Sequence, residues 1–236
     1  MSLLKKCFLF SLLVVGSSYV VSAQVATYQL GKLIYKSNFS NPLDTSIWAV
    51  EKLPADSEIV TCNNGNLLLD TYGGATVWFK QPLKGNVIIS FKRTVLMQGG
   101  KNDRLSDLNV FWMATDSLQN KGFNRKGTFN EYDSLSMYYV GFGGNYNTTT
   151  RFRKYSAKGD KQLLGEYKDT PHLLQANKTY TIQIIQLNGL VQFVVNGKVF
   201  FSYTDKQPLN YGFFAFRSTR SRQAISDFQV YSIKEK

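Results

Sequence analysis

The sequence is poor in the residues that form disulfides and bind zinc. Its 236 residues include two cysteines and one histidine. Cys7 lies in an N-terminal segment that we expect to be removed on export, so Cys62 would have no partner for an intramolecular disulfide. One histidine and one remaining cysteine also exclude the usual zinc site. Apolar burial must therefore hold the fold together, and we expect Cys62 to be a half-buried, unreactive thiol.

The sequence also lacks an apolar run long enough to cross a membrane. A membrane-spanning helix needs about 20 apolar residues, and the run from Cys7 to Val15 is shorter. Two lysines precede this run, and small residues follow it up to Ala23, which is the order found in a secretory signal peptide. We therefore expect residues 1–23 to be a signal peptide and residues 24–236 to be a single domain. The protein would be exported, periplasmic or extracellular, and not membrane-spanning.

Acidic residues are scarce relative to basic ones. Lys and Arg number 28 against 16 Asp and Glu, which gives a formal net charge of +12. A basic exported protein suits an acidic polysaccharide, an anionic envelope or a nucleic acid, although scattered basic residues can simply solubilise a surface. No motif of interleaved basic and aromatic residues points to nucleic acid. We expect a polysaccharide or oligosaccharide partner, whose acidic character the charge favours, and no nucleic acid.

Short segments of alternating hydrophobicity, separated by Gly, Asn, Asp and Pro, fill the rest of the sequence. This pattern is typical of a β-sandwich or barrel. Asn64-Gly65, Asn188-Gly189 and Asn196-Gly197 predict tight hairpins, whereas Lys161–Lys178 is predicted to be a loop or a short helical turn. Trp48 and Trp112 are expected in the core. The predicted strands are Lys32–Phe39, Ile59–Thr61, Asn66–Asp70, Ala75–Phe79, Val87–Leu96, Leu105–Ala114, Leu135–Phe142, Thr149–Tyr155, Thr179–Leu187, Leu190–Val195, Lys198–Tyr203, Gly212–Ser218 and Ala224–Ser232.

Several of these strands combine an apolar face with a second face of mixed aromatic and polar residues. Successive side chains of a strand point to opposite faces. Asp107 and Asn109 therefore share one face of their strand, and Arg151 and Arg153 share one face of theirs. A concave, ligand-binding sheet surface would explain the mixture. The alternative is that a loop covers this face.

Three stretches carry a resemblance to a known family. They are Ser106–Asp116 (SDLNVFWMATD), Tyr132–Arg153 (YDSLSMYYVGFGGNYNTTTRFR) and Asp169–Asn177 (DTPHLLQAN). Over nearly all of the expected mature chain, the sequence resembles an uncharacterised family of exported proteins from polysaccharide-degrading bacteria, chiefly Bacteroidetes. The resemblance implies an all-β fold, a two-sheet antiparallel jelly-roll β-sandwich of the concanavalin A-like type. Related jelly rolls include glucanases, polysaccharide lyases and lectins, so the fold alone does not give the function.

Three kinds of carbohydrate chemistry can be compared with the residues. A retaining glycosidase needs two carboxyl groups about 5 Å apart, but the central strand offers only Asp107 before Asn109. The weak alternatives in nearby loops are Asp103, Glu131 and Asp133. A lyase acting on a uronate needs a cation for the carboxylate, a base and an acid. The pattern Tyr138-Tyr139-Val140-Gly141, followed by Asn145-Tyr146-Asn147, is loosely similar to a motif of alginate-lyase-like jelly rolls, although the lysine of that motif is missing. A lectin needs no acid or base.

These comparisons define a candidate site. We expect an exported protein that cleaves polysaccharide, as a lyase on a uronate-containing glycan or as a glycoside hydrolase, and the alternative is a non-catalytic carbohydrate-binding protein. No cofactor or catalytic metal is required, although a calcium ion could stabilise the sandwich. The candidate catalytic residues are Tyr139, His172 and Asp107, and the candidate substrate-binding residues are Asn109, Arg151, Arg153, Tyr155, Tyr146 and Arg217.

Overall fold

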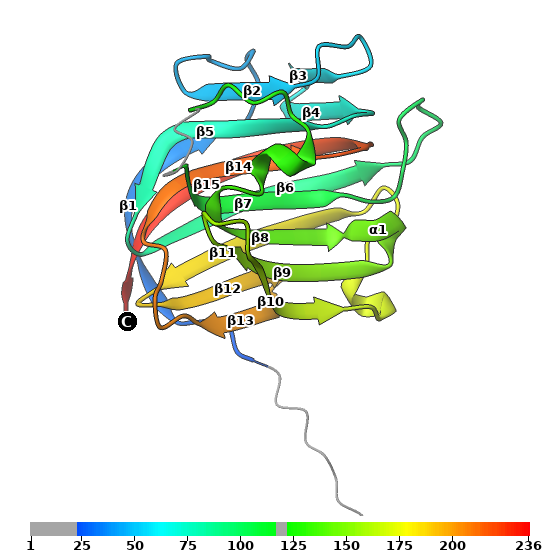
Figure 1. Ribbon diagram of the computed structural model, residues 1–236. Coiled ribbons are helices and arrows are strands. Elements are labelled where there is room, and N and C mark those ends of the chain that lie inside the picture. Colours follow the sequence, from blue (N-terminus) through cyan, green and yellow to red (C-terminus); the bar gives the residue numbers. More distant parts are fainter. Residues whose placement is uncertain (1–22, 117–121) are drawn as a thin grey trace, which may run out of the picture.

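Alternating apolar side chains assemble the chain into two antiparallel sheets that pack face to face (Figure 1). The computed structural model describes residues 23–116 and 122–236. The predicted signal peptide lies outside these residues apart from Ala23, so export stays a prediction. No helix in the described ranges is long and apolar enough to span a membrane.

Each sheet combines a run of consecutive strands with strands that are distant in sequence. The first sheet has eight strands in the order β13 (Lys198–Thr204), β12 (Leu190–Val195), β11 (Thr179–Leu187), β6 (Val87–Leu96), β15 (Ser221–Glu235), β4 (Asn66–Thr71) and β3 (Ile59–Asn63), with β1 (Tyr28–Ser37) paired to β15. The second sheet has seven strands in the order β10 (Lys161–Tyr167), β9 (Thr149–Tyr155), β8 (Ser136–Gly143), β7 (Leu108–Thr115), β14 (Tyr211–Ser218), β5 (Ala75–Lys84) and β2 (Trp48–Lys52). The predicted all-β, two-sheet sandwich is confirmed.

The main core lies between the sheets and is rich in aromatic rings. Trp48 and Trp112 are buried there, as predicted. One cation crosses this core. Arg93 of the eight-stranded sheet donates hydrogen bonds to the backbone oxygens of Asn109 (2.8 Å) and Arg217 (3.0 Å) in the seven-stranded sheet, and its burial lowers its pKa to about 9. Arg93 thus ties the two sheets together directly beneath two strands of the candidate site.

The predicted hairpins and the cysteine are found as expected. Asn64-Gly65, Asn188-Gly189 and Asn196-Gly197 all have positive φ at both residues and join β3 to β4, β11 to β12 and β12 to β13. This backbone conformation matches the twist of the flanking strands. Cys62 is a half-buried free thiol, and burial raises its pKa, which disfavours the reactive thiolate.

Two strands were not predicted. β2 is short, and β10 occupies the first part of Lys161–Lys178, where a loop or helical turn was expected. That expectation is wrong for residues 161–167, because this segment forms a hairpin with the preceding strand β9, although it lacks the alternation of buried and exposed residues that predicts a strand. A helical turn, η2 (Thr170–His172), does follow it.

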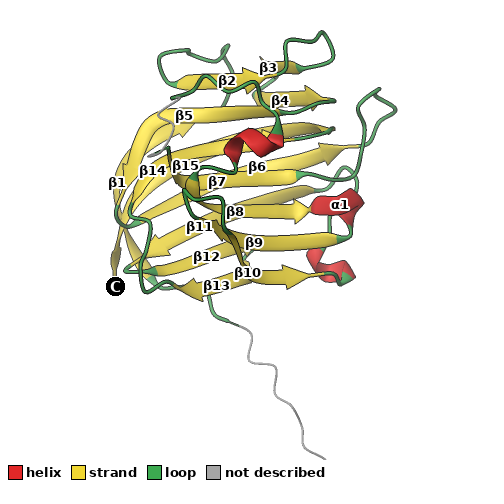
Figure 2. Ribbon diagram, viewed as in Figure 1, coloured by secondary structure: helices red, strands yellow, loops and turns green. Residues whose placement is uncertain are grey.

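The connection between β7 and β8 covers half of the outer face of the seven-stranded sheet (Figure 2). We call residues 122–135 the covering segment; it contains the helical turn η1 (Phe129–Tyr132). Its apolar side chains pack on those of the sheet and form a second core with Trp78, Phe111, Ala114, Met137, Tyr139, Tyr155, Phe213 and Ala215. The buried Glu51 holds the segment down, since its carboxylate accepts hydrogen bonds from Trp78 (2.7 Å), Tyr132 (2.9 Å) and the backbone N–H of Arg125 (2.8 Å).

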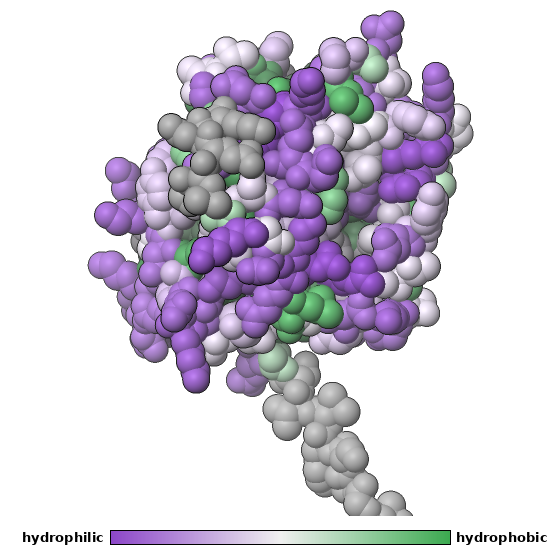
Figure 3. Space-filling view, in the orientation of Figure 1, coloured by the Kyte–Doolittle hydropathy of each residue, from purple (hydrophilic) through white to green (hydrophobic). Residues whose placement is uncertain are grey.

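The surface over this second core is largely hydrophilic (Figure 3). The apolar side chains of the covering segment therefore face the sheet rather than solvent. The sequence predicts either an open sheet face or a face covered by a loop. Both occur, because the covering segment lies over one part of this face and the pocket lies on another.

Candidate functional site

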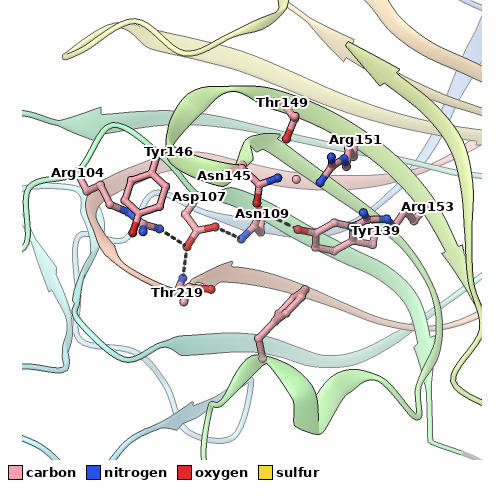
Figure 4. Close-up of a pocket in the computed structure, with 13 residues that line it drawn as sticks. Arg104, Asp107, Asn109, Tyr139, Asn145, Tyr146, Thr149, Arg151, Arg153 and Thr219 are labelled. Carbon is pink, nitrogen blue, oxygen red and sulfur yellow. Dashed lines mark hydrogen bonds and ion pairs between the residues drawn. The ribbon is translucent and has the colours of Figure 1, made fainter. Parts of the chain in front are cut away.

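A pocket of about 250 Å³ lies on the open half of the seven-stranded sheet, where β8 ends and β7 and β9 begin (Figure 4). The loops after β8 and β14 supply part of the rim, and Phe129 of the covering segment closes one side. The lining residues are Arg104, Asp107, Asn109, Phe129, Tyr139, Gly141, Gly144, Asn145, Tyr146, Thr149, Arg151, Arg153 and Thr219.

Asp107 is the only acidic residue in this lining, and hydrogen-bond donors surround its carboxylate. One oxygen accepts from the Asn109 side chain (2.8 Å). The other accepts from the backbone N–H groups of Thr219 (2.8 Å) and Arg220 (3.1 Å) and from the Arg104 guanidinium (3.3 Å). The side chain is nearly buried, and its backbone has a positive φ of 76°. Asp107 thus joins three segments of the chain, which suits a positioning residue better than a proton carrier.

Asn109 links Asp107 to Tyr139 through hydrogen bonds of its side-chain amide. The Tyr139 hydroxyl donates to the Asn109 side-chain oxygen (3.1 Å). A Cβ at Gly141 would lie 2.5 Å from that hydroxyl, so glycine leaves the space for this contact. Burial is the largest cause that raises the pKa of Tyr139 far above its usual value, and the negative charge of Asp107 adds to it. The raised pKa favours the protonated hydroxyl, whose proton is donated to Asn109, and therefore disfavours Tyr139 as a base.

Three arginines give the pocket its positive character. Arg151 forms an ion pair with Glu166 on the neighbouring strand β10, and this hydrogen bond is the main cause that lowers the pKa of Glu166. Arg104 lies over the ring of Tyr146, at 4.9 Å from its centroid. Arg153 has no carboxylate partner within the described part of the chain. Arg104 and Arg151 already have carboxylate partners in Asp107 and Glu166, so the positive charge of Arg153 is the one that most favours an anionic ligand.

A left-handed turn forms the rim beside these arginines. The short helix α1 (Gly144–Asn147) has φ values of 49°, 58° and 60° at Asn145, Tyr146 and Asn147. Such a conformation costs roughly 1–2 kcal/mol per residue for an L-amino acid other than glycine. The Asn147 side chain offsets this cost, because it accepts from the Leu174 backbone N–H (2.8 Å) and donates to its carbonyl oxygen (3.0 Å). As a result, Tyr146 is presented to solvent with 74% of its surface exposed.

Six of the nine predicted site residues line the pocket, namely Asp107, Asn109, Tyr139, Tyr146, Arg151 and Arg153. Three do not. His172 lies on the opposite face of the sheet, where its ring stacks on Tyr167 (3.7 Å between centroids) and contacts Phe200. The structure therefore does not bring His172 to Tyr139. Its side chain also pairs with Asp169.

Tyr155 and Arg217 lie on the expected face but beneath the covering segment. Tyr155 packs against Tyr139 in the second core. Arg217 is fully buried and donates to the side chain of Thr76 and the carbonyl of Gly127, both at 2.9 Å. Its guanidinium also lies over the rings of Phe129 and Tyr132. Neither residue can reach a ligand in the pocket while the segment is in place.

The acids considered as alternatives to Asp107 are engaged elsewhere. Asp103 pairs with Arg222, Asp133 with Lys161, and Glu131 accepts hydrogen bonds from Thr128. The described residues contain no group of three His, Cys, Asp or Glu side chains that could hold a metal ion. The calcium ion stays a prediction.

Sequence reasoning missed several lining residues, among them Arg104, Phe129, Asn145, Thr149 and Thr219. Four of the five lie outside strands. Strand alternation cannot place a loop residue, because its position depends on contacts such as that between Asp107 and Thr219. Asn145 had a detectable signal, since Asn tolerates positive φ and here follows two glycines and precedes Tyr146-Asn147.

Comparison with protein families adds an independent observation. A family model described as "Domain of unknown function (DUF6250)" matches residues 69–228, which is more than half of the chain. The chain belongs to this family. The match spans every residue that lines the pocket, from Arg104 to Thr219. A comparison with curated proteins finds no match.

Solved structures with the same fold are numerous. A Bacillus subtilis protein of unknown function with a galectin-like fold is 18% identical with a TM-score of 0.71, covering 89% of this chain and 100% of the other. An endo-β-1,3-glucanase from Pyrococcus furiosus is 10% identical with a TM-score of 0.63 (91% and 99% covered). The carbohydrate-binding module CBM66 from Bacillus subtilis is 9% identical with a TM-score of 0.57 (78% and 95% covered). At these identities the likeness establishes the fold, and the predicted jelly-roll sandwich is confirmed.

Proposed function

We propose that the protein binds an acidic carbohydrate outside the cytoplasm, with a carboxylate-bearing sugar seated in the pocket. The observation that carries this proposal is the set of Arg104, Arg151 and Arg153 around a pocket whose one acid, Asp107, is already saturated with donors. A guanidinium matches a carboxylate in bidentate fashion. Asn145, Tyr146 and Thr149 add the amide, ring and hydroxyl groups that sugar recognition uses. The glucanase and carbohydrate-binding module among the fold neighbours support carbohydrate as the ligand class.

Cleavage has less support than binding. A retaining hydrolase needs two carboxyl groups, and Asp107 is the only one in the lining. A lyase needs a base, but Tyr139 has a raised pKa and His172 lies on the other face of the sheet. Because the Tyr139 proton is donated to Asn109, its hydroxyl oxygen would instead accept a hydrogen bond from a sugar hydroxyl.

Calorimetric titration with glucuronate and galacturonate, against the neutral glucose and galactose, tests the proposal. The acidic sugars should bind and the neutral ones should bind at least about tenfold more weakly, since a hydrogen bond to a charged group contributes roughly 1.5–3 kcal/mol. Arg153→Gln should reduce uronate affinity by a similar factor. Added salt should weaken uronate binding only modestly, because the pocket is partly shielded from solvent.

A matched control removes one positive charge elsewhere. Lys234 is exposed near the end of β15, whereas the pocket adjoins the other end of that strand through Thr219. Lys234→Gln should therefore bind uronate like the unaltered protein. Equal affinity for acidic and neutral sugars, or equal losses in both variants, would refute the proposal. Unsaturated products or new reducing ends from a uronate polysaccharide would show that the site also cleaves.

A further inference from the structure

A second arginine and tyrosine pair lies next to the pocket and outside its lining. The loop after β4 carries Tyr72, and the loop after β14 carries Arg220. These loops lie side by side because Thr71 pairs with Ser221, and Ala75 pairs with Ser218. The Arg220 guanidinium lies over the Tyr72 ring at 4.6 Å from its centroid, and 55% of the Tyr72 surface is exposed.

This second pair repeats the arrangement of Arg104 over Tyr146, and the two pairs are physically joined. Asp107 accepts hydrogen bonds from the Arg104 side chain and from the Arg220 backbone, and Arg104 also donates to the carbonyl oxygen of Arg220 (2.9 Å). We call Tyr146, Arg104, Arg220 and Tyr72 the arginine–tyrosine ridge. Two cations and two exposed rings thus follow one another along a surface that continues from the pocket.

The Tyr72 end of the ridge is held in place by a buried acid. The Glu58 carboxylate accepts hydrogen bonds from the backbone N–H groups of Tyr72 (2.9 Å), Gly73 (2.6 Å) and Gly74 (3.3 Å). A loop fixed in this way loses little conformational entropy when a ligand binds, so its ring can contribute to affinity.

The direction of the ridge follows from the order of the strands. Its residues lie beside the ends of β8, β7, β14 and β5, which are consecutive in the seven-stranded sheet (Figure 1). Neighbouring strands are about 4.8 Å apart, so the ridge extends roughly 14 Å across the strand ends. The covering segment closes one side of the pocket with Phe129, whereas Tyr146 and Tyr72 of the ridge are exposed to solvent and accessible to a longer ligand.

We infer that Arg220 and Tyr72, at the end of the ridge outside the pocket, form a second subsite, which binds a further unit of the same carboxylate-bearing glycan whose first unit occupies the pocket. This inference rests on the proposed function and makes the ligand a chain rather than a single sugar. Arg220 would pair with a carboxylate of the next units, and Tyr72 would contact a sugar ring through its exposed surface.

The test is the dependence of affinity on ligand length. Galacturonate and its oligomers up to the tetramer are titrated calorimetrically into the unaltered protein and into Tyr72→Ala and Arg220→Gln. Affinity should rise at least about tenfold from the monomer to the tetramer. Both variants should bind the monomer normally and lose most of this gain. The hydrogen bond to Asp107 survives in Arg220→Gln because the donor is the backbone N–H.

Tyr211→Ala is the matched control, since Tyr211 is 51% exposed and lies at the opposite end of β14 from Thr219. It should retain the full gain with length. If the monomer binds and requires Arg153 but longer oligomers bind no tighter, the ridge holds no second subsite and the proposed function stands. If neither monomer nor oligomers bind, both proposals fail. Urea unfolding of each variant checks that the fold is intact.

Discussion

Asp107 shows how one side chain can organise a pocket through its hydrogen bonds. Its four donors come from β7, from the loop before it and from the loop after β14. The Arg104 side chain and the Arg220 backbone therefore both bond to the Asp107 carboxylate. The sequence places an acid on the expected face, and the hydrogen bonds around it suit a positioning role.

Asp107→Asn should lower the free energy of unfolding by about 1–3 kcal/mol. The Asn side chain would replace one carboxylate oxygen, which accepts hydrogen bonds, with an NH₂ group that can only donate to neighbours that are themselves donors. Asn tolerates the positive φ of this position, so backbone strain should not add to the loss. Uronate affinity should fall for the monomer and for the oligomers alike. Urea unfolding measures the first effect and calorimetry the second.

Asp227 provides the control, since it is also an aspartate with positive φ, but its partner is the exposed Lys92. Asp227→Asn should change the free energy of unfolding by less than about 0.5 kcal/mol. Equal effects of the two substitutions would mean that the donors around Asp107 contribute nothing specific.

Among the elements, α1 is distinguished by a left-handed backbone with positive φ values, whereas the strands on either side of it are extended. Its three consecutive left-handed residues stand between β8 and β9 and place Tyr146 at the pocket rim. The pairing of Asn147 with the backbone of Leu174 is what fixes this shape. Strained backbone that the surroundings hold in place is often found at binding sites.

Asn147→Ala should lower the free energy of unfolding by about 2–4 kcal/mol, since it removes two hydrogen bonds and leaves a residue that disfavours positive φ. Asn147→Gly should cost less, because glycine accepts the conformation and loses only the pairing. Urea unfolding of both variants separates strain from pairing. Identical losses would show that the left-handed conformation itself costs nothing here.

The same scale explains which elements the sequence predicts. The bounds of β6, β9, β11 and β12 agree with their predictions, because alternation and flanking turns are local properties. The edge strand β10 was missed although its partner β9 directly precedes it, since none of its residues is buried and its sequence therefore shows no alternation. The site divides in the same way. Arg151 and Arg153 were predicted from alternation, whereas Arg104 and Arg220 are positioned by contacts between distant loops.

At the scale of the whole molecule, buried tyrosines set the response to alkaline pH. Tyr132, Tyr138 and Tyr139 have pKa values raised well above 10, with burial as the largest cause in each. Between the unfolded and folded pKa values the folded state holds a proton that the unfolded state releases, so stability is lost as pH rises. Burial lowers the pKa values of Arg93 and Arg217, which acts in the opposite direction. The tyrosines with raised pKa values among the described residues outnumber them and are Tyr28, Tyr132, Tyr138, Tyr139, Tyr155 and Tyr180.

The free energy of unfolding should therefore be steady from neutral pH to about pH 9 and should fall above about pH 10. Urea midpoints across this range measure the loss, and tyrosinate absorbance shows whether ionisation accompanies unfolding. A midpoint that stays constant to about pH 11, or tyrosines that ionise fully in the folded protein, would contradict the assignment.

Two of the apolar clusters, the core between the sheets and the second core, hold the three tryptophans of the chain. Trp48 and Trp112 belong to the core between the sheets, and Trp78 lies beneath the covering segment. Local opening and global unfolding need not coincide in a protein. Trp78 therefore gives the chain an intrinsic fluorophore for the outer cluster, so that detachment of residues 122–135 would alter its emission while the signals of the other two indoles stayed native.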